Sequence, residues 1–345
     1  MSIYFLAVFI SFLLNAILIV PFINFLYKLK FQRLAQKTKD IFNKHTPIFD
    51  KYNERKAGTP VGGGILTVTT TVLLFAFLLL LFALFDQPLQ SNFPSLIVEI
   101  KIILFAFVGF AFLGVFDDLN KIFFMQKSQF HGLRIRYKLL IEIVLALVIA
   151  WWLFFDLKIS FFYIPFFGVF KIGLWFIPIA TFIIVSFANA VNIADGLDGL
   201  ASGVMAIALI SFWVISRSIL DVPTSLFISA WLGGLIAFLY FNIPPARLFL
   251  GDTGALSFGA TFAVIGLVLG KSFSLTIIGG IFVIEIFTSL VQLLGKKFLH
   301  RKIFPVAPLH LWLQARGWEE SKIVMRFWVI SILFAFLGLL IAFLK

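Results

Sequence analysis

Long apolar stretches alternate with short polar segments along almost the whole chain. A helix that crosses the hydrocarbon core of a bilayer needs about 20 apolar residues, and shorter runs are tolerated beside broken or re-entrant segments. Ten stretches fit this description, near residues 3–27, 61–85, 99–116, 139–155, 174–188, 199–216, 225–241, 254–270, 274–294 and 324–343. The pattern predicts an all-α polytopic membrane protein with about ten transmembrane helices, forming a single integral membrane domain over residues 1–345. Because ten is even, both termini are expected on the same side.

The composition supports a membrane-embedded chain. Of the 345 residues, 61% are hydrophobic and 13% are charged, and the mean hydropathy is +1.08, whereas soluble proteins carry roughly 25% charged residues. The chain has no cysteine, which excludes disulfides and thiolate metal sites. The first 20 residues lack a basic segment and a small-residue cleavage site, so we expect a retained first span and not a signal peptide.

The basic residues separate onto one face of the predicted bundle. Residues 28–60 carry nine Lys or Arg, residues 117–138 carry five, residues 296–326 carry seven, and Arg247 adds one, which places 22 of 28 on this face. The positive-inside rule makes the face cytoplasmic and both termini extracytoplasmic. The net charge of +12 then faces mainly the anionic headgroups of the bilayer. Nucleic acid is not expected as a partner, because these residues flank spans and form no separate domain.

One outer loop, residues 157–173, is rich in aromatic and β-branched residues and is interrupted by Pro165 and Gly168. This composition predicts a small β-hairpin at the outer surface.

Five aspartates fall at three edges of the predicted cytoplasmic face: Asp117, Asp118, Asp195, Asp198 and Asp252. Converging carboxylates repel one another unless a cation neutralises them. In a chain without cysteine, such oxygen ligands suit Mg²⁺, which takes one or two carboxylates together with substrate phosphates. Mg²⁺ beside lysine stabilises charge on a transferring phosphoryl group. The alternative is helix capping, which is routine for Asp and Asn at helix ends; three such loops together favour a shared site.

Three polar segments carry a family resemblance: DDLNK (117–121), NAVNIADGLDGLA (189–201) and FLGDTGALSFG (249–259). With them the sequence resembles the polyprenyl-phosphate N-acetylhexosamine-1-phosphate transferases, and within that superfamily the bacterial phospho-N-acetylmuramoyl-pentapeptide transferases. The stretches GTPVGGGI (58–65), IEIFTSLVQ (284–292) and residues 307–331 extend the resemblance over nearly the whole chain in the same order.

The resemblance implies an activity and a location. The expected reaction transfers phospho-MurNAc-pentapeptide from its UDP carrier to undecaprenyl phosphate, giving lipid I and UMP in peptidoglycan synthesis. The expected cofactor is Mg²⁺, and the expected partners are the UDP-sugar, undecaprenyl phosphate and the bilayer; a homodimer is left open. The implied location is the bacterial inner membrane, with five cytoplasmic loops forming the active site.

The resemblance also assigns roles to single residues. Catalytic roles fall on Asp117, Asp118, Asp252 and His310, and the metal ligands are Asp252 and Asn192. The predicted substrate-binding residues are Lys121, Lys138, Asn189, Asn192, Asp195, Asp198, Asn242 and Phe249. We predict that Asp117 positions the lipid phosphate or acts as its base. Asp195 and Asp198 are expected to line a wet cleft as solvated carboxylates.

One departure from the family leaves alternatives open. The family has three consecutive histidines where this chain has His310-Leu311-Trp312. A related transferase that uses UDP-GlcNAc is therefore the first alternative. A secondary transporter is a second, and it predicts carboxylates buried in the middle of spans. In the predicted spans only Glu285 lies deep, and we interpret it as a hydrogen-bonded structural residue.

Overall fold

The computed structural model describes residues 1–33, 50, 54–124 and 135–344. The helices are α1 (Ser2–Lys28), α3 (Gly63–Leu84), α4 (Leu96–Leu119), α5 (Ile135–Phe155), α6 (Phe176–Ala194), α7 (Leu200–Ser218), α8 (Val222–Asn242), α9 (Gly251–Val268), α10 (Ser272–Ile278), α11 (Gly280–Phe298), α12 (Leu309–Ala315) and α13 (Glu320–Phe343). Within this part of the chain, nine helices are long and apolar enough to cross a bilayer, and the bent pair α10–α11 would make a tenth. The predicted all-α, multi-pass architecture is confirmed.

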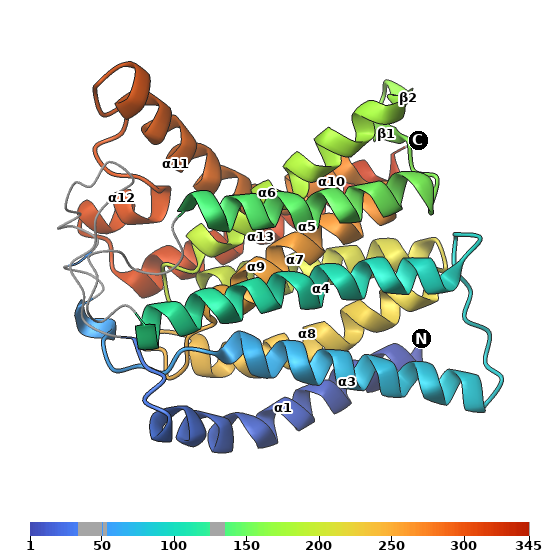
Figure 1. Cartoon of the computed structure of the whole chain (residues 1–345), viewed down its shortest axis with the longest axis horizontal. Coiled ribbons are helices and arrows are strands. Elements are labelled where there is room, and N and C mark those ends of the chain that lie inside the picture. Colours follow the sequence, from blue (N-terminus) through green and yellow to red (C-terminus); the bar gives the residue numbers. More distant parts are fainter. Residues whose placement is uncertain (34–49, 51–53, 125–134, 345) are drawn as a thin grey trace.

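Most of the long helices lie side by side, with the two chain ends at one end of the bundle (Figure 1). The β-hairpin lies at that same end, and α12 lies at the opposite end. The hairpin consists of β1 (Phe161–Ile164) and β2 (Gly168–Lys171), antiparallel with Phe161 opposite Lys171. It falls inside the segment where the sequence predicted it.

The predicted ninth span is broken and not straight. Helices α10 and α11 meet at an angle of 81° at Gly279. The ring of Phe187 would lie 2.6 Å from a Cβ at Gly279, and the ring of Phe334 would lie 2.7 Å from one at Gly280. Paired glycines therefore let two aromatic rings pack against the backbone at the bend, and glycine pairs are a common cause of helix kinks.

Helix α9 is the centre of the bundle, and every residue from Asp252 to Val268 is buried. Helices α3, α4 and α6 pack directly against it. The packing is close because a Cβ at Gly114 of α4 would lie 2.4 Å from the Thr253 backbone, and one at Gly64 of α3 would lie 2.2 Å from Gly254. These contacts set the last turn of α4 beside the first turn of α9, where the aspartates of both helices lie.

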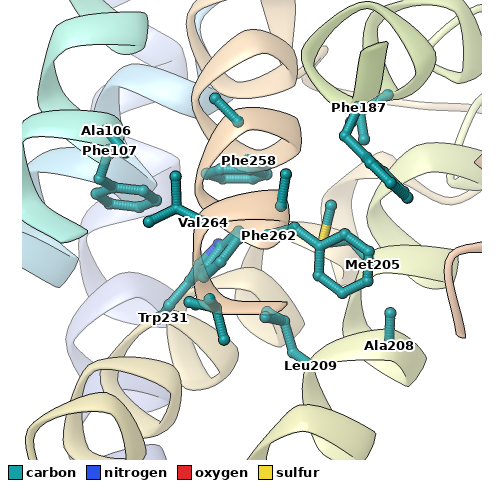
Figure 2. Close-up of a cluster of buried hydrophobic side chains, with 14 of the residues drawn as sticks. Ala106, Phe107, Phe187, Met205, Ala208, Leu209, Trp231, Phe258, Phe262 and Val264 are labelled. Carbon is teal, nitrogen blue, oxygen red and sulfur yellow. The ribbon is translucent and has the colours of Figure 1, made fainter. Parts of the chain in front are cut away.

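Aromatic rings fix the middle of this contact (Figure 2). Phe107 of α4 and Phe258 of α9 stack with ring centroids 5.9 Å apart, and Trp231 of α8 lies 5.2 Å from Phe107 and 5.0 Å from Phe258. All three side chains are fully buried. Aromatic pairs of this kind contribute about 0.5–1.5 kcal/mol beyond their area burial, so they stabilise the register that positions the polar end.

Candidate active site

Asp118, at the end of α4, binds the first turn of α9. Its carboxylate accepts hydrogen bonds from the backbone N–H groups of Asp252 and Thr253, both at 3.0 Å, and from the Thr253 hydroxyl at 2.7 Å. A helix start leaves such N–H groups without intrahelical partners, and α9 has no side-chain cap of its own. The geometry therefore gives Asp118 a positioning role; a direct catalytic role stays a prediction.

Asp117 and Asp252 share two lysines. Lys121 Nζ lies 3.2 Å from Asp117 Oδ2 and 2.7 Å from Asp252 Oδ1. Lys138, at the start of α5, lies 3.1 Å from the same Asp117 oxygen and donates to Asp252 Oδ2. The Lys121 side chain is 35% exposed and that of Asp252 is 11% exposed, so the cluster is accessible from solvent. The structure thus brings together four predicted site residues from α4, α5, α9 and the π-helical turn Asn120–Phe124.

The two predicted asparagines of α6 face different partners. The Asn192 amide nitrogen lies 3.5 Å from Asp252 Oδ2, which places Asn192 at the edge of the lysine–aspartate cluster. Asn189, about one turn earlier, donates to the carboxylate of Glu142 on α5 and to the Val185 carbonyl. Asn192 therefore lies beside Asp252, and its role as a metal ligand stays a prediction; Asn189 is linked to the cluster through α5, where Glu142 lies one turn after Lys138.

Asn242 is the last residue of α8, and Phe249 lies in the α8–α9 loop, two residues before α9 begins. The Asn242 side chain is buried and spans three segments: it accepts from Gly199 N at 3.1 Å and Ser202 Oγ at 2.7 Å, and donates to Leu248 O at 3.0 Å. These bonds join the loop before α9 to the start of α7. Phe249 is held by its backbone, which accepts from Gly62 N–H and donates to the Pro60 carbonyl.

Asp198 is not a solvated carboxylate, and that expectation is wrong. Its side chain is 8% exposed and forms an ion pair with Lys56 at 2.7 Å. Its second oxygen accepts from Ala246 N at 3.0 Å, and its backbone N–H donates to Glu320 at 2.6 Å. Lys56 also binds Glu320 at 2.5 Å. Asp198 is buried because four segments meet around it and exclude water. They are the α6–α7 loop, the α8–α9 loop, the Glu54–Lys56 turn and the start of α13.

Asp195 differs from Asp198. It directly follows the last residue of α6 and is only partly buried. Burial, and then the nearby Asp252 carboxylate, raise the pKa of Asp195 well above its usual range. The two aspartates of the predicted pair therefore lie in different environments: the pKa of Asp195 is raised, whereas Asp198 is fixed in an ion pair with Lys56.

His310 is anchored by Glu285. Both side chains are buried, the His310 backbone N–H donates to Glu285 Oε1 at 3.2 Å, and Nδ1 lies 2.9 Å from Oε2. A Cβ at Gly196 would lie 2.7 Å from His310 Nε2, so the far side of the ring lies against the Asp195–Asp198 loop. Glu285 is hydrogen-bonded, as interpreted from the sequence, and its partner is a predicted catalytic residue. A carboxylate that holds one imidazole nitrogen fixes the ring orientation.

The sequence did not identify several charged residues of this end. Lys56, Glu320, Glu142 and Arg33 make contacts with, or act electrostatically on, the predicted site residues. For two of them the sequence offered an indication, because they lie in or beside stretches that carry the family resemblance. Lys56 directly precedes AGTPVGGG, and Glu320 lies in the Gly-Trp-Glu-Glu stretch. Their partners are far apart in the chain, so spacing gave no indication of the pairs.

The residues at the cluster fit a magnesium ion. Asp117 and Asp252 offer carboxylate oxygens and Asn192 an amide, and the two lysines show that this pair of carboxylates attracts cations. Among the described residues there is no group of three or more His, Cys, Asp or Glu arranged as a metal cage. In phosphoryl-transfer sites Mg²⁺ binds through one or two protein carboxylates and the substrate phosphates.

A family model described as glycosyl transferase family 4 matches residues 100–270, which include the cluster of Asp117, Lys121, Lys138 and Asp252. Fold and site together define a membrane-embedded transferase of this kind. Relatives named phospho-N-acetylmuramoyl-pentapeptide-transferase occur in Clostridium perfringens (strain SM101 / Type A), 35% identical over 96% of this chain and 94% of the relative, and in Geobacillus sp. (strain WCH70), 33% identical over 97% of each. A third, from Caldanaerobacter subterraneus subsp. tengcongensis, is 35% identical over 92% of each. The chain belongs to the phospho-N-acetylmuramoyl-pentapeptide-transferase family.

Proposed function

We propose that the chain transfers phospho-MurNAc-pentapeptide from UDP to undecaprenyl phosphate, releasing UMP and forming lipid I for peptidoglycan synthesis. The observation that carries the proposal is the cluster at one end of the bundle, in which Asp117 and Asp252 share Lys121 and Lys138. Such a site supplies both signs of charge next to solvent and lipid, as a reaction between two phosphate-bearing substrates requires. The names of the relatives point to the same reaction.

In this proposal each group has a separate task. An oxygen of the lipid phosphate attacks the β-phosphorus of the UDP-sugar, and the bond from that phosphorus to the bridging oxygen breaks, so UMP leaves with the bridging oxygen. Asp117 accepts the residual proton of the lipid phosphate. Lys121 and Lys138 orient Asp117 and Asp252. Mg²⁺, held by Asp252 and Asn192, would stabilise the charge that develops on the diphosphate.

The UDP-GlcNAc alternative is tested by comparing donors. The purified protein with undecaprenyl phosphate and Mg²⁺ should release UMP from UDP-MurNAc-pentapeptide at least tenfold faster than from UDP-GlcNAc. The reverse preference would assign the chain to the other branch, and no UMP from either donor would reject the transferase proposal. The relatives given above are all named as transferases, which argues against a transporter.

We propose that the active-site end faces the cytoplasm and that the termini face outward. The support is the charge count, which puts 22 of 28 basic residues on this side of the chain. Lys297, in the last turn of α11, and Phe167, in the turn between β1 and β2, are both exposed. The end of α11 and the hairpin lie at opposite ends of the bundle (Figure 1). In this cysteine-free chain, Phe167→Cys should react with an impermeant maleimide on intact cells, and Lys297→Cys only after permeabilisation. The opposite labelling pattern would invert the orientation.

A further inference from the structure

Arg33 is held in place beside the site by backbone hydrogen bonds on both of its peptide groups. Its N–H donates to Thr59 O at 2.9 Å, and its carbonyl accepts from Gly58 N at 2.8 Å. The same segment continues to Pro60 and Val61, which form bridges to Gln32 and to Phe249 respectively. Three short segments that are distant in the sequence thus lie side by side, and they fix where the Arg33 side chain begins.

The guanidinium of Arg33 lies over the ring of Phe249, 5.8 Å from its centroid. Arg33 is half-buried, and among the described residues its side chain is in no ion pair. Carboxylates are nonetheless near enough to act on it: Asp195 most strongly, then Asp198, Asp252 and Glu320. Asp198 and Glu320 are paired with Lys56, and Asp252 is paired with Lys121 and Lys138. Within the part of the chain that the structure describes, Arg33 therefore contributes a positive charge that is in no ion pair.

Burial makes such a charge costly and lowers the pKa of Arg33, although a guanidinium keeps its proton in proteins. An anionic ligand would offset this cost. A guanidinium presents N–H groups in a planar fork that matches two phosphate oxygens, and these charge-assisted bonds are about twice as strong as neutral ones. The ring below it belongs to Phe249, a predicted substrate-binding residue that is 9% exposed.

We infer that Arg33 is a substrate-binding residue that contacts the diphosphate of the UDP-sugar next to Phe249. The inference rests on the proposed function and adds to it a phosphate contact that lies outside the lysine–aspartate cluster. The nucleotide is favoured over the lipid phosphate because Arg33 lies over Phe249 and because, of the carboxylates given for it, Asp195 of the Asp195–Asp198 loop acts on it most strongly.

The test compares ligands that share the base and differ in phosphates. Binding of uridine, UMP and UDP to the full-length detergent-solubilised protein is measured by calorimetry for the wild type, Arg33→Gln and Arg33→Lys. Arg33→Gln should weaken UDP binding about tenfold or more, equal to about 1.4 kcal/mol, and change uridine binding less than twofold. Arg33→Lys should lie between, because it keeps the charge and loses the fork. The control is Arg247→Gln, whose guanidinium lies 5.5 Å over Phe241 at an exposed position; it should bind UDP normally.

Three outcomes would overturn the inference. Equal losses for uridine and UDP would mean that Arg33 only shapes Phe249, and unchanged UDP binding would mean no contact with phosphate. A raised KM for undecaprenyl phosphate with normal UDP binding would place the contact on the lipid substrate. If Arg33→Gln fails to fold, the test uses Arg33→Lys. A lower ratio of UDP to uridine affinity than in the wild type then supports the phosphate contact, and an unchanged ratio overturns it. Wild-type UMP release, measured on the same preparation, keeps the failure of this inference separate from failure of the proposed function.

Discussion

Replacing Asp252 with asparagine should abolish turnover and leave the protein folded. The substitution removes one charge from the cluster in which Asp252 binds Lys121 and Lys138 and is the predicted principal ligand of Mg²⁺. We expect UMP release to fall on the order of a thousandfold or more, which corresponds to roughly 4 kcal/mol of transition-state stabilisation. The fold should persist because the first turn of α9 is held through the backbone N–H of Asp252, which asparagine retains.

A matched control uses an aspartate–lysine pair at the other end of the bundle. Asp156 binds Lys101 at 3.2 Å with both side chains more than a third exposed, and such surface pairs contribute little to stability. Asp156→Asn should therefore match the wild type in UMP release and melting temperature. Near-normal, Mg²⁺-dependent activity in Asp252→Asn would show that the metal and the chemistry lie elsewhere.

Asp198→Ala should lower both stability and activity. The ion pair with Lys56 is almost completely buried, and removing one partner of a buried pair costs about 3–5 kcal/mol. Lys56 keeps Glu320, so a loss of roughly 2–4 kcal/mol is expected. Turnover should fall more than tenfold in the surviving folded protein, about 1.4 kcal/mol, because the loop that follows Asp195 loses its anchor. Thermal unfolding and UMP release on the same samples measure the two effects.

A double-mutant cycle with Lys56→Met separates the pair from its surroundings. If the ion pair is what stabilises the loop, the double variant should be less destabilised than the sum of the single variants. Strictly additive losses, or an unchanged melting temperature in Asp198→Ala, would return Asp198 to the solvated role that the sequence suggested.

The membrane helices could be predicted because the length of an apolar run determines them. Runs of about 20 apolar residues are needed to cross a bilayer, and α1, α3, α8 and α13 follow these runs closely. The break between α10 and α11 could not be located in the same way, because Gly279 and Gly280 lie within a continuous apolar run. The bend depends on rings of Phe187 and Phe334 that arrive from other helices.

The two adjacent aspartates show how much of the site could be predicted. Capping and a shared catalytic site were competing interpretations of these loops, and the two neighbouring aspartates make different contacts. Asp118 caps α9 from another helix, whereas Asp117 joins the lysines of the cluster. The sequence predicted that both aspartates lie at the site. Which of the two carboxylates binds the backbone of α9 is determined by the close approach of α4 to α9 at Gly114.

Long-range ion pairs could not be predicted from the sequence. Asp198 looks like a loop carboxylate, and its burial depends on Lys56, Glu320 and the Ala246 backbone from three other segments. Glu285 looks like an isolated charge within a span, and its partner His310 lies in the short helix α12, which follows later in the chain. In each case the partner is defined by the packing of the bundle and not by spacing along the chain.

The fate of the two phosphorus atoms of the donor tests the central claim most directly. UDP-MurNAc-pentapeptide radiolabelled at the β-phosphorus is incubated with the purified protein, undecaprenyl phosphate and Mg²⁺, and the lipid and aqueous products are separated. Transfer of the phospho-sugar predicts the label in the lipid and unlabelled UMP in the aqueous phase, with the label lost from the lipid in Asp252→Asn. Label that leaves as UDP would show transfer of the sugar without its phosphate and would contradict the account.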